Sequence, residues 1–136
     1  MDFFNAINVA TTGLKAQGAR MRVISENIAN ASSTAKNPGG DPYRRQVPTF
    51  KAAYDREIEA YGVKLGKIKQ DNSDFNLRYE PGHPAADETG YVKYPNVNAL
   101  IETMDLREAQ RSYEANMNMI SASRQMLAKT IDLMNK

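Results

Sequence analysis

Along residues 3–30, apolar side chains recur at steps that alternate between four and three, which is the spacing of one face of an α-helix. The seam consists of Phe3, Ile7, Ala10, Leu14, Gln17, Met21, Ile24 and Ile28, and Gln17 is its only polar member. Such a narrow stripe predicts one long helix with a coiled-coil-like contact face. Gly13 and Gly18 lie within it and indicate either an imperfect helix or the close approach of a neighbouring helix.

Residues 97–135 show the same alternation and predict a second long helix. Its seam consists of Leu106, Ala109, Tyr113, Asn116, Ile120, Ser123, Leu127, Thr130 and Met134. Either Asn96 or Asn98 can cap the first turn, because a short polar side chain accepts hydrogen bonds from the free N–H groups there. Asn116 falls on the seam itself, where a buried polar side chain can fix the register of two helices.

A further apolar stripe runs beside the second seam. Met119, Met126 and Leu133 recur at a spacing of seven, and Ala115 and Ala122 form a short patch of small residues with the same spacing. One partner helix cannot cover the seam and these rows together. The stripe is therefore either ordinary core within the chain or a contact surface for other subunits.

The segment 47–95 carries short alternating runs that predict β-strands. The clearest is "FNLRY", which places three side chains on one face of a strand: Phe75, Leu77 and Tyr79. A run that begins with "GVKL" shifts phase at Gly66 and predicts a bulge, whereas residues 50–62 fit a helix or a strand equally well. Three or four such strands make a ribbon or a small sheet with little core.

Between the first helix and these strands, residues 31–46 are rich in Ser, Pro and Gly and predict a polar, basic hinge. The expected fold is mainly α with a small β module, in which the long N- and C-terminal helices pair as an antiparallel coiled coil. Antiparallel pairing follows because the connecting module has to loop out and return. The expected segments are an N-terminal helix (1–31), a hinge with an outer β module (32–95) and a C-terminal helix (96–136).

Composition narrows the function further. The chain has 136 residues and a net charge of +2, from 18 basic and 16 acidic residues, a balance that gives no reason to expect nucleic acid as a partner. It has no cysteine, so disulfides and thiolate metal sites are excluded. No apolar run is long enough for a membrane span, and the N-terminus lacks the features of a cleavable signal peptide.

Candidate chemistry is sparse. The only histidine, His83, has Asp87 and Glu88 nearby, but one imidazole and two acids between prolines indicate a surface turn rather than a metal site. Residues 71–74 resemble a calcium loop only faintly and lack its glycine and terminal glutamate. We therefore expect no catalytic, cofactor-binding or metal-binding residues and no cofactor, so that the chain is not an enzyme.

Several segments resemble one family. The run "ENIANASS" (26–33) is similar to the segment that follows the first helix of bacterial flagellar axial proteins, which build the rod and hook. The runs "YPNVNALIETM" and "REAQRSYEANMNMI" resemble the start and middle of their C-terminal helix. The insert "KNPGGDPYRRQ" and the segment "YEPGHPAADETGYVKYPNVN" are similar to proximal rod members. One departure is Asn98, where many axial proteins carry Asp.

The resemblance implies a structural subunit of the proximal rod of the flagellar basal body, a helical drive shaft that crosses the periplasm and transmits torque from motor to hook. It implies export through the flagellar type III apparatus without a cleaved signal, and helices that form the inner D0 coiled coil. The implied partners are other copies of the chain, the proximal rod proteins FlgB and FlgF, the adapter FliE and the distal rod protein FlgG. The residues alone leave open a freestanding coiled-coil adaptor.

The expected assembly residues lie on the two seams and in the hinge. For helix packing and assembly they are Phe3, Ile7, Leu14, Met21, Ile24, Ile28, Leu106, Tyr113, Asn116, Ile120, Leu127 and Met134. In the hinge they are Asn27, Asn30, Tyr43, Arg44 and Arg45. Asn27 and Asn30, like Asn96 and Asn98, suit helix ends, and the basic loop suits a neighbour's acidic surface. Charge reversal at both arginines is then expected to weaken motility.

Overall fold

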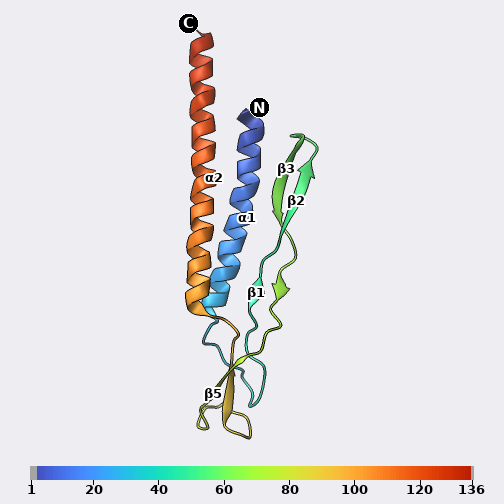
Figure 1. Cartoon of the computed structure of the whole chain (residues 1–136), viewed down its shortest axis with the longest axis vertical. Helices are drawn as coiled ribbons and strands as arrows, with labels where there is room; N and C mark the ends of the chain where they lie inside the picture. Colours follow the sequence, from blue (N-terminus) through green and yellow to red (C-terminus); the bar gives the residue numbers. More distant parts are fainter. Residues whose placement is uncertain (1–2, 136) are drawn as a thin grey trace. The chain divides into compact units, whose positions relative to one another are not determined.

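Two long helices begin and end the part of the chain that the computed structural model describes, residues 3–135. Helix α1 runs over Phe3–Ala29 and α2 over Ala99–Met134 (Figure 1). Asn98 caps α2, because its Oδ1 accepts hydrogen bonds from the backbone N–H groups of Leu100 (3.0 Å) and Ile101 (3.4 Å). The predicted mainly α fold is thus confirmed. Residues 1, 2 and 136, where the predicted terminal segments start and stop, lie outside the described part.

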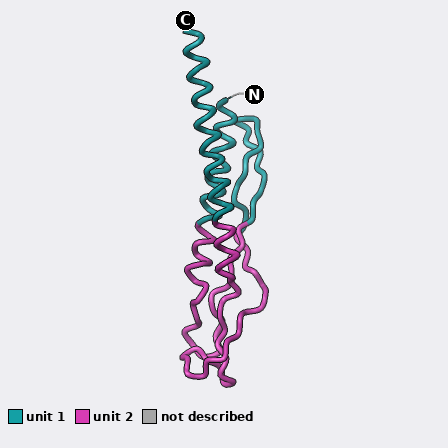
Figure 2. Tube along the Cα trace, turned by 60° about the vertical axis from the view of Figure 1, so that its left-hand side comes forward, with its two compact units in different colours: residues 1–21, 49–67, 107–136 teal, residues 22–48, 68–106 magenta. Residues whose placement is uncertain are grey.

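The chain divides into two compact units (Figure 2). The first unit comprises residues 1–21, 49–67 and 107–136, and the second comprises residues 22–48 and 68–106. Each unit contains part of α1 and part of α2, together with strands from the middle of the chain. Each unit therefore has its own set of buried side chains, and the types of residue buried in the two units differ.

In the first unit, α1 and α2 pack antiparallel. A Cβ atom added at Gly13 would lie 2.9 Å from the Asn116 amide, and Arg20 pairs with Glu108 at 3.7 Å. Residue numbers therefore fall along α2 as they rise along α1, which is the antiparallel arrangement. The buried side chains between the helices are small: Ala10, Ala16, Ala109 and Ser123. Gly13 thus marks a close helix approach, whereas nothing lies within 4 Å of a Cβ at Gly18. The two glycines have different roles.

The first unit also holds a β-ribbon. Strand β2 (Phe50–Asp55) pairs antiparallel with β3 (Ala60–Leu65) and lies beside α1 (Figure 1). The ambiguous segment 50–62 is therefore a hairpin, whose turn holds Glu59 at a positive φ of 49°. Gly62 lies against α1, because a Cβ there would come within 2.9 Å of the Thr12 hydroxyl, which accepts a hydrogen bond from the Val63 N–H (3.1 Å).

At Gly66 the strand breaks instead of bulging. The Gly66 N–H donates to the Thr49 carbonyl (2.6 Å), and the Thr49 hydroxyl donates to the Lys67 carbonyl (2.6 Å). A side chain at Gly66 would clash with the Thr49 hydroxyl, since its Cβ would lie 2.6 Å away. The predicted bulge is therefore corrected to a sharp strand end, closed by two hydrogen bonds to one threonine.

The second unit contains two further antiparallel ribbons. Strand β1 (Gln46–Val47) pairs with β4 (Lys69–Gln70), and β5 (Asn76–Tyr79) pairs with β6 (Tyr91–Tyr94). Its buried side chains include Val23, Ile24, Val92, Val97 and the polar pair Asn27 and Glu102. The alternation predicted for β5 does not bury one face, because all four residues of this strand are exposed. A lone ribbon has no second layer to cover it.

Candidate functional site

The second unit is organised around a buried asparagine in the last turn of α1. Asn27 keeps only 1% of its surface exposed. Its Nδ2 donates to the Gln46 carbonyl (2.8 Å) and to Glu102 Oε2 (3.1 Å), and its Oδ1 accepts from the Tyr43 hydroxyl (2.8 Å) and the Gln46 N–H (2.9 Å). Both polar ends of the amide are thus satisfied by the hinge, strand β1 and helix α2.

A buried carboxylate faces this asparagine from the first turn of α2. Glu102 is 1% exposed, and its Oε1 accepts a charge-assisted hydrogen bond from Nε of Arg45. Arg45 also lies near Asp71 (3.5 Å) and Asp105 (3.9 Å). A negative charge in the first turn of a helix is favourable because the free N–H groups carry partial positive charge. Glu102 therefore joins the start of α2 to the hinge through a paired, buried charge.

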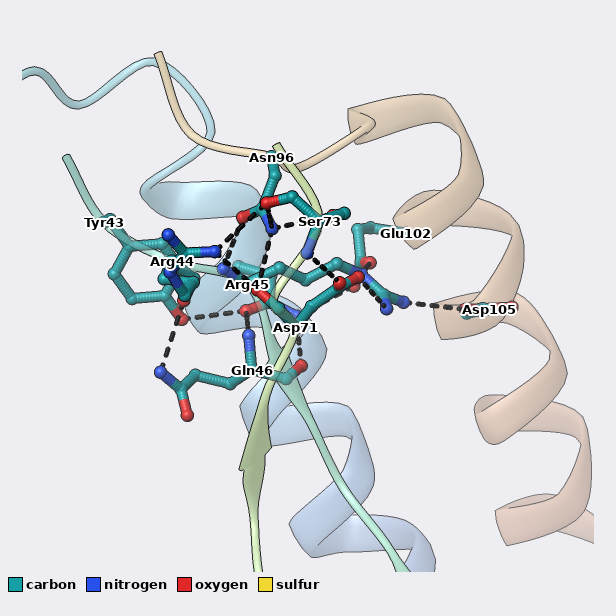
Figure 3. A network of polar contacts seen from close by, with 10 residues as sticks. Tyr43, Arg44, Arg45, Gln46, Asp71, Ser73, Asn96, Glu102 and Asp105 are labelled. Atoms are coloured by element: carbon teal, nitrogen blue, oxygen red, sulfur yellow. Dashed lines mark hydrogen bonds and ion pairs between the residues drawn. The ribbon is translucent and has the colours of Figure 1, made fainter. Parts of the chain in front are cut away.

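The hinge supplies most of the remaining contacts (Figure 3). Arg44 donates from Nη1 to the carbonyls of Asp71 and Ser73, each at 3.0 Å, and its guanidinium lies 4.2 Å from the centre of the Phe75 ring. Asn96 accepts from the Arg45 N–H (2.9 Å) and donates to the same two carbonyls, at 3.0 and 3.2 Å. The loop 71–73 is held from two sides, by an arginine and an asparagine.

This environment shifts three pKa values. Burial, reinforced by the charges of Glu26 and Glu102, raises the pKa of the Tyr43 hydroxyl, which therefore stays protonated and donates to Asn27. Hydrogen bonds from Ser73, with the nearby charge of Arg45, lower the pKa of the Asp71 carboxyl. Burial lowers the pKa of Arg45, but its hydrogen bond to Glu102 and the surrounding carboxylates outweigh this and raise it.

Four of the five predicted hinge residues meet in this network. Tyr43, Arg44 and Arg45 all bind partners within the second unit, and the predicted contact of this loop with another subunit stays a prediction. The helix-end role expected for Asn27 and for Asn96 is wrong, because both side chains cross-link distant segments instead. The fifth residue, Asn30, donates locally to the Glu26 carbonyl at 2.8 Å.

The predicted helix residues lie mostly along the helix seams. Ile24 is buried; half-buried are Phe3, Ile7, Leu14, Met21, Ile28, Leu106, Tyr113, Asn116, Ile120 and Leu127. Met134 is 80% exposed. In the first unit the neighbouring stripe of Met119, Met126 and Leu133 is 46%, 48% and 74% exposed, so a large part of its apolar surface is left uncovered within the described chain. A groove of about 450 Å³ lies between the helices and β3, bordered by Val9, Ala60 and Met119 among others.

Glu102 and Asp71 were missed by sequence reasoning. A signal for Glu102 was available, because it precedes Leu106 by four residues and so extends the second seam by one position. A charged residue on a seam needs a buried partner of opposite charge. Nothing local marked Asp71, whose partner Arg45 lies far from it in the sequence.

The candidate metal ligands named from the sequence lie apart from one another. Among residues 3–135, no three histidine, cysteine or acidic side chains gather closely enough to hold a metal ion. His83 has a local role, because its Nδ1 accepts a hydrogen bond from the Ala85 N–H (3.0 Å) and so closes a turn. Neither helix of the described part is long and apolar enough to span a membrane. The polar network instead joins backbone segments that lie far apart in the sequence.

Comparison with known proteins agrees with this structural role. Residues 7–35 match the family described as "Flagella basal body rod protein", and residues 88–133 match "Flagellar basal body rod FlgEFG protein C-terminal". The chain is 50% identical to a flagellar basal-body rod protein FlgC of Agrobacterium fabrum, over 95% of this chain and 93% of the relative. FlgC proteins of Borreliella burgdorferi and Bacillus subtilis are 40% and 39% identical, over 98% of this chain and 99% of each relative.

The paired terminal helices, the polar hinge and these matches define a structural protein of the flagellar basal-body rod, a class without enzymatic activity. Within that class, the chain belongs to the FlgC family.

Proposed function

We propose that the chain is a subunit of the proximal rod, a helical shaft that passes torque from the flagellar motor to the hook. The observation that carries this proposal is the apolar surface of the first unit, which exceeds what the chain itself covers. Met119, Met126 and Leu133 line one side of α2, and Ile131 is 49% exposed on the same last turns. In a monomer, a stripe this long is a liability, whereas in a shell of packed helices it is contact surface.

The ends of the two helices support the same proposal. Gly13 lies opposite Asn116, ten residues after the described start of α1, whereas α2 continues from Asn116 for eighteen residues to Met134. The last two turns of α2 therefore have no part of described α1 beside them. Open helical assembly uses such heterologous surfaces, since a surface of one subunit meets a different surface of the next.

The finer features belong to the same proposal. The expected neighbours are other copies of the chain, FlgB, FlgF, the adapter FliE and the distal rod protein FlgG. The expected location is the periplasmic part of the basal body, reached through the flagellar type III export apparatus without a cleaved signal. The seam and hinge residues named from the sequence are the expected packing positions, and the polar network of the second unit keeps the hinge in one conformation.

The test is deletion of the gene in its flagellated host, with motility scored and basal bodies imaged. We expect loss of rod and hook, restored by the intact gene and not by a copy that lacks residues 128–136. A sharper variant replaces Ile131, Leu133 and Met134 by Gln, and its matched control neutralises Lys129 and Asp132 on the same turns. Normal flagella in the deletion strain would overturn the proposal and favour a freestanding coiled-coil adaptor.

A further inference from the structure

Strand β2 of the first unit has one edge paired with β3 and one edge turned away from it. In an antiparallel pair, residues alternate between pairs that exchange hydrogen bonds and pairs whose N–H and C=O groups point away from the partner strand. The Val63 N–H donates to the Thr12 hydroxyl (3.1 Å) and so points away from β2. The pair Ala52–Val63 is therefore of the second type, and the pairs of Phe50 and Tyr54, two positions to either side, are of the same type.

The outer edge of β2 is defined here by the main-chain N–H and C=O groups of Phe50, Ala52 and Tyr54. Within residues 3–135 no hydrogen bond to these groups is found, and all three residues are exposed. The strand contains neither a proline nor a bulge, the two backbone features that most directly stop an edge from pairing. The other edge of the ribbon is covered, because the Val63 N–H of β3 is bonded to α1. An open row of alternating donors and acceptors is complementary to an extended strand.

The side chains of β2 indicate what kind of strand fits. On the outer edge, Lys51, Ala53 and Asp55 take the positions at which neighbouring strands approach most closely, with about 4.5 Å between Cα atoms. An acidic residue opposite Lys51 and a basic residue opposite Asp55 would each form a cross-strand ion pair. On the other face, Phe50 is 41% and Tyr54 52% exposed, so apolar neighbours are favoured there. The best-matched antiparallel strand therefore reads base, apolar, any residue, apolar, acid from its N-terminus.

We propose that the outer edge of β2 binds an extended segment of a different protein of the basal body, which adds to the ribbon as an antiparallel third strand. The inference rests on the proposed rod function and adds to it the surface and the kind of segment through which a neighbour is recognised. Two β2 strands paired about Ala53 would also match Lys51 with Asp55. That arrangement is two-fold and closes, whereas a rod repeats in one direction, so a second copy does not fit this edge.

Proline provides the first test, because it removes one N–H from the outer edge alone. In the full chain, Ala52→Pro deletes a donor that points away from β3, and proline is tolerated at such an edge position. Ala52→Val keeps the donor and is the matched control. We expect both variants to keep the circular dichroism and nearly the Tm of the parent chain. In the complemented deletion strain, only Ala52→Pro is expected to lower the number of rods and the swimming speed, at least severalfold.

Charge exchange tests which molecule supplies the third strand and does not depend on proline. Lys51→Glu or Asp55→Lys places like charges across the new strand pair and is expected to reduce the number of rods severalfold. With a different protein as partner, the combined variant is expected to be worse than either single change. With a second copy as partner, both strands carry the exchange and match again, so recovery of motility would overturn the proposal. Lys64→Glu, across the ladder from Lys51, is the control and is expected to leave motility unchanged.

Cross-linking identifies the neighbour directly. Tyr54 is replaced in the full chain by the photoreactive p-benzoylphenylalanine, and purified basal bodies are illuminated. Peptide mapping by mass spectrometry is expected to find one segment of another protein with the base, apolar, any, apolar, acid order. A cross-link to a second copy or to a segment without this order, or no cross-link in normally assembled rods, would overturn the proposal and leave the rod function intact. Normal flagella in the deletion strain would instead overturn the proposed function, so the two failures are distinguishable.

Discussion

The two units of this chain use opposite ways of holding the same two helices. In the first unit, the side chains buried between α1 and α2 are alanine and serine, and the large apolar residues lie partly or wholly outside. In the second unit, a buried polar contact joins the helices, Asn27 with Glu102, supported by Arg45 and Tyr43 from the hinge, beside the buried apolar side chains of Val23 and Ile24. One unit holds its helices by close approach and the other by a hydrogen-bonded network.

The difference matters because the two kinds of contact tolerate change differently. A network of buried polar groups permits one arrangement and is costly to break, since each unpaired group keeps its desolvation penalty. A seam of small residues buries little apolar area, and each methylene contributes only about 0.8 kcal/mol. The second unit therefore has the more strongly specified conformation.

The largest effect is expected for Glu102→Ala. Removing this carboxylate deprives Arg45 of its buried partner and leaves Nδ2 of Asn27 with one acceptor fewer, so we expect a loss of about 3 to 5 kcal/mol in the free energy of unfolding. Urea unfolding followed by circular dichroism measures it. Asp105→Ala on the same helix is the control, and its 3.9 Å contact is worth less than about 1 kcal/mol. Equal losses in the two variants would show that Glu102 has no special role.

A paired substitution separates the two units directly. Asn27→Leu leaves the N–H and the carbonyl of Gln46 without their partner, so we expect a loss of about 2 to 3 kcal/mol. In Asn116→Leu, by contrast, the only hydrogen bond shown for the amide, to the Ser112 carbonyl of its own helix, is lost from a half-buried site. Its effect is expected to stay within about 1 kcal/mol. A larger loss at Asn116 than at Asn27 would contradict the contrast drawn between the units.

The glycines of α1 give a smaller, two-sided effect. Alanine stabilises a helix interior by up to about 1 kcal/mol relative to glycine, and Gly18→Ala adds its methyl group where no atom lies within 4 Å. Gly13→Ala places its methyl group 2.9 Å from the Asn116 amide, so the gain is offset by displacement of that side chain. Thermal unfolding is expected to show a higher Tm for Gly18→Ala than for Gly13→Ala. When Asn116→Ala is added to both variants, their Tm values are expected to become similar, because the side chain that the new methyl group displaces is gone.

The smallest expected effect is the pH dependence that arises from Asp71. Because its pKa is lowered in the folded chain, the folded state binds the proton less tightly than the unfolded chain does. Its contribution is therefore present at neutral pH and is lost as the pH falls below about 4, through the folded pKa. The stability difference between the parent chain and Asp71→Asn is expected to be under about 1 kcal/mol at pH 7 and to shrink by pH 3. A difference that grows in acid would contradict this assignment.

Sequence patterns predicted the long elements well and the connections poorly. The alternation of four and three identified both helices to within two residues, because it repeats over many turns and reports burial directly. The hairpin at 50–62 stayed ambiguous, since its apolar residues face water and give no burial signal. The polar network could not be predicted from the sequence, because no local pattern links its members. Only the fold brings together Asn27, Arg45, Asp71 and Glu102.

The distance along the chain between Asn27 and Glu102 has a consequence for the order of folding. The two residues are separated by 75 positions, so their contact closes a long loop. Closing a long loop costs chain entropy, and we therefore expect this contact to form late in folding. When a chain emerges with its N-terminus first, at a ribosome or through a pore, α1 and the hinge are exposed well before Glu102 on α2 has emerged. The β2–β3 hairpin can form at once, but the hinge becomes fixed only after the C-terminal helix has arrived.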